Sequence, residues 1–274
     1  AYLLKYDTVY GVWDQDVKAK DDAIMVGRKK IPVFSEKDPS KLPWKELKVD
    51  VVIEATGVFK TEKDAGAHLK AGAKKVIITA PAKDDTKTIV LGVNESDAKG
   101  RTILSNASCT TNAAASVMKA LESLDIQRAM LTTIHAYTAS QTLVDGPEKD
   151  PRRGRAGAMN IVPTSTGAAI ATSKTIPSLK DKFDGISVRV PVVSGSLVDI
   201  TFVAGRETTV EEVNKLIQTA SKSRALNGIL AWTDEPIVSS DIIGDPHSSI
   251  VDLLMTRVVD GELVKIVAWY DNEW

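Results

Sequence analysis

Short uninterrupted aliphatic runs in the first 110 residues constrain the fold of this chain most strongly. Three triplets and a shorter fourth run occupy residues 51–53, 76–78, 89–91 and 103–104. Such runs are typical of strands that are buried on both faces of a parallel sheet. Between the first two runs, Thr61 can cap a helix and Gly72 can end it. Strand, helix and strand joined by short links predict a parallel α/β sheet.

The pattern changes near residue 110, where longer amphipathic segments begin. We expect helices over 113–124 and 209–225, strands over 127–137, 186–193 and 197–203, and a hairpin of 250–259 with 263–270. A polar loop fills 138–160, and a further hairpin of 23–26 with 31–34 lies near the start of the chain. Antiparallel sheet combined with helices predicts an α+β unit for this second part.

Composition and charge exclude several classes of function. The 274 residues suggest about two domains. Lys plus Arg number 35 and Asp plus Glu number 36, so the charge balance does not point to nucleic acid or to an anionic membrane. No apolar run reaches the ~18–20 residues of a membrane span. With Cys109 as the single cysteine, an internal disulfide and a cysteine-based zinc site are both excluded, and we predict no metal.

Cys109 lies in the segment Ser-Asn-Ala-Ser-Cys-Thr-Thr-Asn at 105–112, between a short strand and a predicted helix. Unpaired N–H groups and the helix dipole at such a position lower the pKa of a thiol and favour the thiolate. Its neighbours Ser108, Thr110 and Asn112 are suited to a helix start. The alternative is an unreactive buried cysteine beside a capping serine.

His135 provides the cysteine with a candidate base. It follows Cys109 by 26 residues, across one helix and one strand, so the chain can return to its starting point. An imidazole at that place can accept the thiol proton. The alternative is a structural histidine, which is the commoner role of a single histidine on a strand. We interpret His68 and His247, in polar or loop surroundings, as structural.

Two anion-binding elements complete the candidate site. Residues 163–169 carry hydroxyls and a glycine and are expected to open a helix whose free N–H groups bind phosphate. Arg153 and Arg189 can each bind phosphate oxygens through two parallel hydrogen bonds. Arg189 also interrupts an apolar strand, where a charge needs an anionic partner. The alternative for Arg153 and its neighbours is a solvated loop, or an ion pair with Glu148 or Asp150.

In the segments that contain these residues, the chain resembles the phosphorylating glyceraldehyde-3-phosphate dehydrogenase family. The segment 105–112 is similar to that family's active-site signature. Further similar segments occur in the family's order at residues 1–7, 54–59, 134–138, 160–169 and 269–274. The resemblance implies an α/β plus α+β fold, in which an incomplete Rossmann-type parallel sheet precedes an antiparallel-sheet catalytic domain.

The activity that the resemblance implies is the oxidation of D-glyceraldehyde 3-phosphate to 1,3-bisphosphoglycerate with NAD and inorganic phosphate. Cys109 matches the nucleophile and His135 its activating base. The thiolate forms a hemithioacetal with the aldehyde, hydride transfer to the nicotinamide leaves a thioester, and phosphate displaces the acyl group. The alternatives are an erythrose-4-phosphate dehydrogenase and a non-catalytic binding or assembly protein on the same fold.

The resemblance also implies the binding residues. The substrate's own phosphate matches Thr138 and Arg189, and the attacking phosphate matches Ser108, Arg153, Thr166 and Gly167, with Thr110 beside the nucleophile. The cofactor contacts match Lys37, Thr56, Gly57, Phe59, Thr79 and Asn272. NAD is the expected cofactor, which Gly146-Pro147 favours, with NADP as the alternative.

One departure from the family changes the expected extent of the chain. No two of the 17 glycines are spaced as Gly-x-Gly, so the family's opening phosphate loop has no match. We therefore expect a partial chain that lacks this unit and the family's C-terminal helix, and that binds NAD weakly. The expected divisions are a partial NAD-binding domain at 1–108, a catalytic domain at 109–271, and the start of the return to the first domain at 272–274. The resemblance further implies a homotetramer at full length and a cytoplasmic location.

Overall fold

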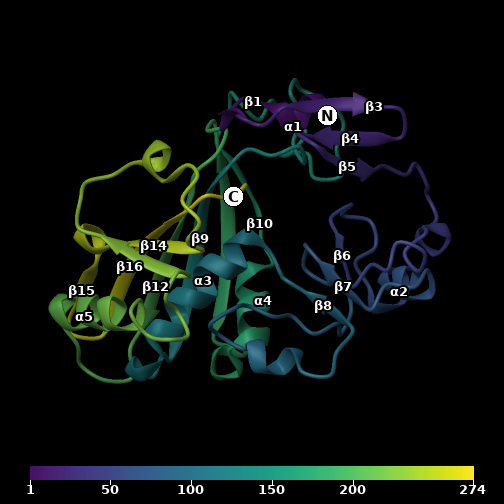
Figure 1. The fold of residues 1–274 in the computed structure, drawn as a ribbon. Helices are drawn as coiled ribbons and strands as arrows, with labels where there is room; N and C mark the ends of the chain where they lie inside the picture. Colours follow the sequence, from purple (N-terminus) through teal and green to yellow (C-terminus); the bar gives the residue numbers. More distant parts are fainter.

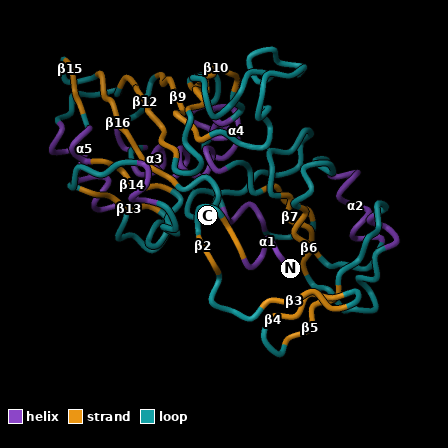
Figure 2. Tube along the Cα trace, turned by 90° about the horizontal axis from the view of Figure 1, so that it is seen from above, coloured by secondary structure: helices purple, strands orange, loops and turns teal.

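The computed structural model describes all of residues 1–274. One large sheet with its helices occupies one side of the molecule, and three smaller sheets occupy the other (Figure 1). The C-terminus lies between these parts and the N-terminus lies among the small sheets, as the view from above also shows (Figure 2). The rings of Tyr10 and Trp274, near the opposite ends of the sequence, have centroids 5.3 Å apart.

The N-terminal segment forms short antiparallel elements. A one-turn helix α1 (Tyr2–Lys5) precedes the strand pair β1 (Tyr6–Asp7) and β2 (Gly11–Val12). A three-stranded sheet follows, made of β3 (Val17–Lys20), β4 (Ala23–Val26) and β5 (Lys29–Pro32). The hairpin predicted here is present, but its second strand begins two residues early. A two-residue turn at Gly27, whose φ is +55°, joins β4 directly to β5.

The predicted parallel sheet is present and consists of β6 (Val51–Glu54), β7 (Lys75–Ile78) and β8 (Ile103–Ser105). Helix α2 (Glu62–Lys70) connects the first two strands, and the Thr61 hydroxyl accepts the Asp64 N–H at its start. The helix ends before Gly72, which has φ +108°, and a Cβ there would lie 2.5 Å from Cβ of Lys45. Only glycine fits this close approach.

Two expectations for this sheet are wrong. Val51 and Ile53 are 45% and 57% exposed while Val52 and Glu54 are buried, so one face of β6 is covered and the other is open to solvent. Residues 89–91 form no strand, and the segment makes a single bridge between Thr88 and Ser105. The side chain of Asn94 accounts for the difference, since its oxygen accepts the Val90 N–H and its nitrogen donates to Thr88 O.

The large sheet has the strand order β10-β11-β9-β12-β16-β14-β13, with β15 paired to β16. The strand bounds are β9 Arg128–Ala136, β10 Val162–Ser165, β11 Phe183–Val190, β12 Ser196–Val203, β13 Leu230–Thr233, β14 Ser249–Asp252, β15 Arg257–Val259 and β16 Leu263–Tyr270. The sheet is mixed, because β9 with β11 and β13 with β14 are parallel pairs within an otherwise antiparallel arrangement. No helix or strand interrupts residues 138–160, which confirms the predicted loop.

Helices cover one face of this sheet. They are α3 (Cys109–Ala120), α4 (Ala168–Thr175) and α5 (Val210–Ala220). Short 3-10 turns complete the fold at Pro39–Lys41, Glu95–Ala98, Glu122–Leu124, Pro177–Leu179, Ser239–Ile242 and Leu253–Met255. A core of 27 buried apolar residues lies between the sheet and these helices, whereas the small parallel sheet has a core of four.

Three boundaries in this part differ from expectation. The helix predicted from 113 begins at Cys109, because the Ser108 side chain caps it. The segment predicted to open a helix at 163 is instead strand β10, and α4 begins only at Ala168. The strand predicted over 250–259 is broken in two, since the Asp252 carboxylate accepts the Leu254 N–H and starts a 3-10 turn.

Candidate active site

The turn that presents Cys109 is tightly specified. Ala107 joins β8 to α3 and adopts φ +59°, a left-handed conformation that non-glycine residues rarely adopt. Its N–H is held by the Ser105 hydroxyl at 3.1 Å, and that hydroxyl donates to Ala80 O at 2.7 Å. Ser108 then caps the helix by accepting the Thr111 N–H at 3.1 Å. Cys109 is therefore the first helical residue, as the sequence predicted for a nucleophile.

His135 lies beside the thiol at the end of β9. Its Nε2 is 3.6 Å from Sγ of Cys109, and its Nδ1 is 2.7 Å from Ala136 O. With its proton on Nδ1, the ring donates to that carbonyl and leaves the Nε2 lone pair facing the thiol. Arg189 Nη1, which can only donate, then bonds the same carbonyl at 3.0 Å and not Nδ1. Burial, together with the charge of Arg189, lowers the pKa of His135 to about 4. The imidazole is thus neutral near pH 7 and able to accept a proton.

The pKa of Cys109 departs from expectation. Burial raises the pKa of the thiol above its ordinary value. Hydrogen bonds from Thr110, the charge of Arg189 and the Cys109 N–H act in the opposite direction but do not outweigh burial. The prediction that the helix start lowers this pKa is therefore wrong for the thiol in its buried surroundings. A thiol that rests protonated needs the neighbouring imidazole to remove its proton.

Tyr270 connects the nucleophile to the base, and the sequence did not reveal it. Its fully buried hydroxyl lies 2.8 Å from the Thr110 hydroxyl and 2.9 Å from that of Thr133. Its ring packs edge-on against His135, with centroids 6.0 Å apart. Burial raises the pKa of Tyr270, so the phenol remains neutral. The tyrosine ties the start of α3 to β9.

Arg189 is placed for an anion beside the histidine. It pairs in register with His135 across the parallel strands β9 and β11. Its Nη1 is 2.9 Å from His135 Nδ1, 3.0 Å from Ala136 O and 3.5 Å from the Thr138 hydroxyl, while its buried Nε has no partner. Burial, with the nearby charge of Arg153, lowers the pKa of Arg189. Two cations and an unsatisfied donor together favour an anionic ligand.

Arg153 lies beside Asp150, and an ion pair between these two residues is one of the alternatives that the sequence left open. Its Nε donates to the Thr164 hydroxyl at 3.0 Å and lies 3.8 Å from the Asp150 carboxylate. Thr164 itself donates to Asp150 at 3.0 Å. The remaining phosphate candidates lie at the start of α4, where Gly167 occupies the N-cap position and the Thr166 hydroxyl accepts the Ala168 N–H.

A cavity of about 450 Å³ adjoins the thiol, and its lining includes Thr79, Asn106, Cys109 and Asn272. Asn272 accepts the Ser196 hydroxyl at 2.7 Å, while its buried Nδ2 has no partner. An orphaned amide donor beside the thiol fits a ligand that carries a carbonyl oxygen, such as a nicotinamide carboxamide. The cavity includes two of the residues that were predicted to contact the cofactor.

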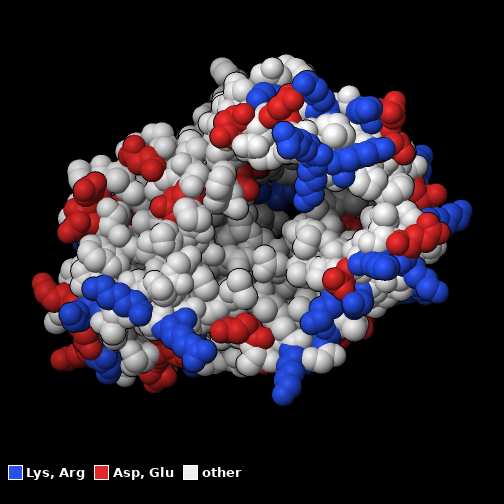
Figure 3. Space-filling model, in the orientation of Figure 1, with Lys and Arg blue, Asp and Glu red and all other residues white.

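The other predicted cofactor residues lie outside this lining. Thr56, Gly57 and Phe59 form the turn after β6, and Gly57 has φ +71°. Lys37 is exposed on the segment that follows β5. The space-filling view shows a hollow below the N-terminal strands, with basic and acidic side chains at its margin (Figure 3).

Asp271 anchors the segment that carries Asn272. Its carboxylate accepts the Tyr10 hydroxyl, the Ser194 hydroxyl and the Gly244 N–H, at 2.8 to 2.9 Å, and the Glu273 N–H at 3.0 Å. Burial by itself would raise the pKa of Asp271, but these donors outweigh it and hold the pKa below its usual value. The sequence around this aspartate carries no signal for its role, because Tyr10, Ser194 and Gly244 are far away in the chain.

Neither histidine outside the site lies free in a loop. His68 is buried on α2 and not in a loop, and its partner there is the polar carboxylate of Glu54. His247 is half-buried, with Nδ1 2.7 Å from Asp245. No cluster of three or more metal-ligating side chains occurs. None of the helices has the length and apolar character needed to span a membrane.

Comparison with known proteins agrees with this geometry. Residues 108–272 match the C-terminal domain of glyceraldehyde 3-phosphate dehydrogenase, and residues 1–62 match its NAD binding domain. Glyceraldehyde-3-phosphate dehydrogenase 2 of Streptomyces avermitilis is 52% identical over 277 residues, which cover 100% of this chain and 82% of that protein. The Borreliella burgdorferi enzyme is 50% identical over 282 residues, covering 100% and 84%. Glyceraldehyde-3-phosphate dehydrogenase 2 of Bacillus subtilis is 48% identical over 277 residues, covering 100% and 81%.

This chain belongs to the glyceraldehyde 3-phosphate dehydrogenase family. Membership confirms the predicted fold class and an NAD-dependent oxidoreductase. NAD fits the chain's own residues, because the orphaned Asn272 amide and Thr79 share a cavity with Cys109. The roles of the individual site residues rest on the geometry described above.

Proposed function

We propose that this chain oxidises D-glyceraldehyde 3-phosphate and joins the acyl product to inorganic phosphate, giving 1,3-bisphosphoglycerate. The observation that carries the proposal is the pair formed by Cys109 and His135, 3.6 Å apart, with Arg189 beside the histidine. This arrangement combines a nucleophile, a neutral base and an anion-binding cation in one place. The names of the relatives, all glyceraldehyde-3-phosphate dehydrogenases, support the same substrate.

The first chemical step belongs to the Cys109–His135 pair. His135 Nε2 accepts the thiol proton while Sγ attacks the aldehyde carbon, and the proton then passes to the aldehyde oxygen to give a hemithioacetal. Bound NAD supplies a hydride acceptor for the oxidation of this adduct to a thioester. His135 removes the hydroxyl proton in that oxidation, because its low pKa keeps it neutral beforehand.

The second step regenerates the thiol. A phosphate oxygen attacks the thioester carbonyl, the C–S bond breaks, and the sulfur leaves as thiolate, which takes back the proton that His135 removed in the oxidation. In this proposal Thr138 and Arg189 hold the substrate's own phosphate, whereas Ser108, Arg153, Thr166 and Gly167 hold the attacking phosphate. Two separate sites are needed because both anions are present when the acyl group moves. Asn272 and Thr79 orient the cofactor, with Lys37, Thr56, Gly57 and Phe59 along its length.

The decisive experiment measures NADH formation with and without inorganic phosphate. We expect glyceraldehyde 3-phosphate to support phosphate-dependent turnover and Cys109→Ser to abolish it. Faster, phosphate-independent oxidation of erythrose 4-phosphate would assign the substrate differently. Absence of NADH formation with either aldehyde would instead favour a non-catalytic protein.

We further propose that the chain is divided into an NAD-binding part at 1–108, a catalytic part at 109–271 and a return segment at 272–274. The start of the C-terminal domain match, at residue 108, supports a division near the nucleophile, whereas the match to the NAD binding domain ends at residue 62. The phosphorylated substrate and the soluble cofactor of the proposed reaction favour the cytoplasm as the location. Cell fractionation with an antibody against the chain tests that placement.

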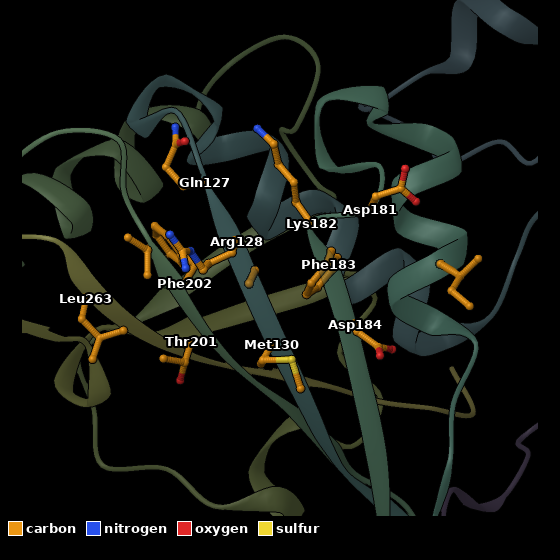
Figure 4. Close-up of a pocket in the computed structure, with 13 residues that line it drawn as sticks. Gln127, Arg128, Met130, Asp181, Lys182, Phe183, Asp184, Thr201, Phe202 and Leu263 are labelled. Atoms are coloured by element: carbon orange, nitrogen blue, oxygen red, sulfur yellow. The ribbon is translucent and has the colours of Figure 1, made fainter.

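A homotetramer is supported by the sheet face that no helix covers. Met130, Ile186 and Leu263 on this face are 58%, 49% and 42% exposed. Met130 and Thr201, register partners on β9 and β12, line a cavity of about 690 Å³ there (Figure 4). Apolar side chains gathered on one face are typical of an association surface. Sedimentation should show a tetramer that Met130→Glu dissociates, while Lys63→Glu on α2 leaves it intact.

A further inference from the structure

A buried polar chain lies beneath the turn that carries the proposed cofactor contacts. Glu54, at the end of β6, is 3% exposed, and His68 on α2 is 5% exposed. His68 Nε2 is 2.9 Å from Glu54 Oε2, and the Trp44 indole N–H donates to His68 Nδ1 at 3.0 Å. The proposed reaction uses none of these three residues.

The direction of each hydrogen bond is fixed by the tryptophan. An indole N–H can only donate, so His68 Nδ1 must be the acceptor and carries no proton. The ring proton is then on Nε2, where it is donated to the Glu54 carboxylate. The histidine is therefore a neutral connector whose tautomer is set by Trp44, and the two rings lie 29° from parallel with centroids 6.3 Å apart.

The other carboxylate oxygen of Glu54 holds the turn itself. It accepts the Thr56 N–H at 2.8 Å and the Thr56 hydroxyl, and that hydroxyl accepts the Val58 N–H at 3.1 Å. The backbone oxygen of Glu54 accepts the Thr79 N–H at 3.0 Å. The Phe59 ring packs edge-on against His68 at 6.4 Å. Three proposed cofactor contacts thus depend on two buried residues, Thr56 and Phe59 through the side chains of Glu54 and His68 and Thr79 through the Glu54 backbone.

We propose that Glu54, His68 and Trp44 form a positioning relay that sets the geometry of the NAD-binding turn. Glu54 is a positioning residue and not a catalytic one, because the cavity beside Cys109 does not include it. The relay is important because the hydrophobic core of this small sheet is a cluster of four buried residues, against 27 behind the large sheet. The inference rests on the proposed function for its cofactor, but not for its structural consequence.

The test replaces Glu54 by Gln, which keeps the shape but presents an amide N–H₂ to groups that are themselves donors. The matched control is Glu46→Gln, an exposed residue two positions from Trp44 that makes no hydrogen bond or ion pair. We expect KM for NAD to rise about 10-fold or more in Glu54→Gln, with kcat and the rate of Cys109 alkylation unchanged. Trp44→Phe, which keeps a ring and removes one N–H, should give a smaller rise of about threefold.

A second readout needs no cofactor. Amide hydrogen exchange at Thr56 and Val58, whose N–H groups depend on the Glu54 carboxylate directly or through the Thr56 hydroxyl, should accelerate about 10-fold in Glu54→Gln, with exchange in β9 unchanged. Unchanged exchange at these two amides overturns the relay, and so does faster exchange with an unchanged KM for NAD. Absence of NADH formation by the wild-type chain would contradict the proposed function instead, and the exchange measurement would still decide the relay. If Glu54→Gln fails to fold, Trp44→Phe is judged by the same two criteria.

Discussion

The large mixed sheet and the small parallel sheet hold their functional residues by different means. Behind the large sheet, 27 buried apolar residues fix β9 and α3, so Cys109 and His135 meet on rigid elements. Behind the small sheet there are four, and the strand ends are fixed by the Glu54–His68 pair instead. A large apolar core can position the residues of a site through packing. Where the apolar core is small, hydrogen bonds between buried polar groups position them instead.

The largest effect should come from the region with the dense core. His135→Asn removes the base but keeps a side chain that can form hydrogen bonds, and we expect NADH formation to fall by roughly 10²–10⁴-fold. The melting temperature should stay close to that of the wild type. A variant that retained more than a tenth of the activity would show that another group removes the thiol proton.

The next largest effect should be on stability, where substitutions in the two hydrophobic cores should lower the free energy of unfolding by different amounts. Leu131→Ala, in the large core, should lower the free energy of unfolding by about 2–5 kcal/mol. Val76→Ala, in the small core, removes fewer methyl groups from a thinner layer and should lower it by about 1–2 kcal/mol. Urea unfolding of both variants measures the difference. Equal losses would contradict the contrast between the cores.

Lowering the pH should reduce the free energy of unfolding, because His135 is neutral in the folded chain. The pKa of this histidine falls from 6.5 to about 4 in the folded chain because of burial and the charge of Arg189. As pH falls from 6.5 towards 4, the unfolded chain binds a proton that the folded chain does not. This linkage should remove roughly 3 kcal/mol of the free energy of unfolding by pH 4. His135→Asn should flatten the slope over this window, and an unchanged slope would assign the acid sensitivity to other groups.

Removing a helix cap should have the smallest effect on stability. One cap can be removed in each region, so the two regions can be compared directly. Thr61→Ala removes the hydroxyl that accepts the Asp64 N–H at the start of α2, and Thr209→Ala removes its counterpart for Glu212 in α5. Each should lower the free energy of unfolding by about 1 kcal/mol. In the small sheet, however, the loss should also speed local amide exchange in α2, because little apolar burial supports that helix. Equal protection of both helices would contradict this expectation.

The sequence predicted the parts of the site that local patterns encode. A cysteine between a strand and capping residues, followed by a histidine one helix and one strand later, was sufficient to place Cys109 against His135. The short aliphatic runs predicted β6, β7 and β8 correctly. The third run, at residues 89–91, forms no strand, because the competing bonds of Asn94 to Thr88 and Val90 have no hydrophobic signature.

Residues whose partners are remote in sequence could not be predicted. Tyr270 bonds Thr110 and Thr133, which lie 160 and 137 residues away. The pairing of Glu54 with His68 depends on how α2 packs on the sheet, and periodicity alone does not fix that register. The raised pKa of Cys109 also could not be predicted from the sequence, because the desolvation of the thiol depends on how the folded chain packs around it.

The Asp271 carboxylate has a consequence for the order in which this chain folds. It joins groups as far apart as Tyr10, 261 residues away, and it immediately precedes the asparagine that lines the cavity beside Cys109. Contacts that close so large a loop carry a high entropic barrier and form late. Refolding should therefore restore helical circular dichroism before it restores the cavity. The cavity beside the thiol would then be among the last features of the molecule to appear.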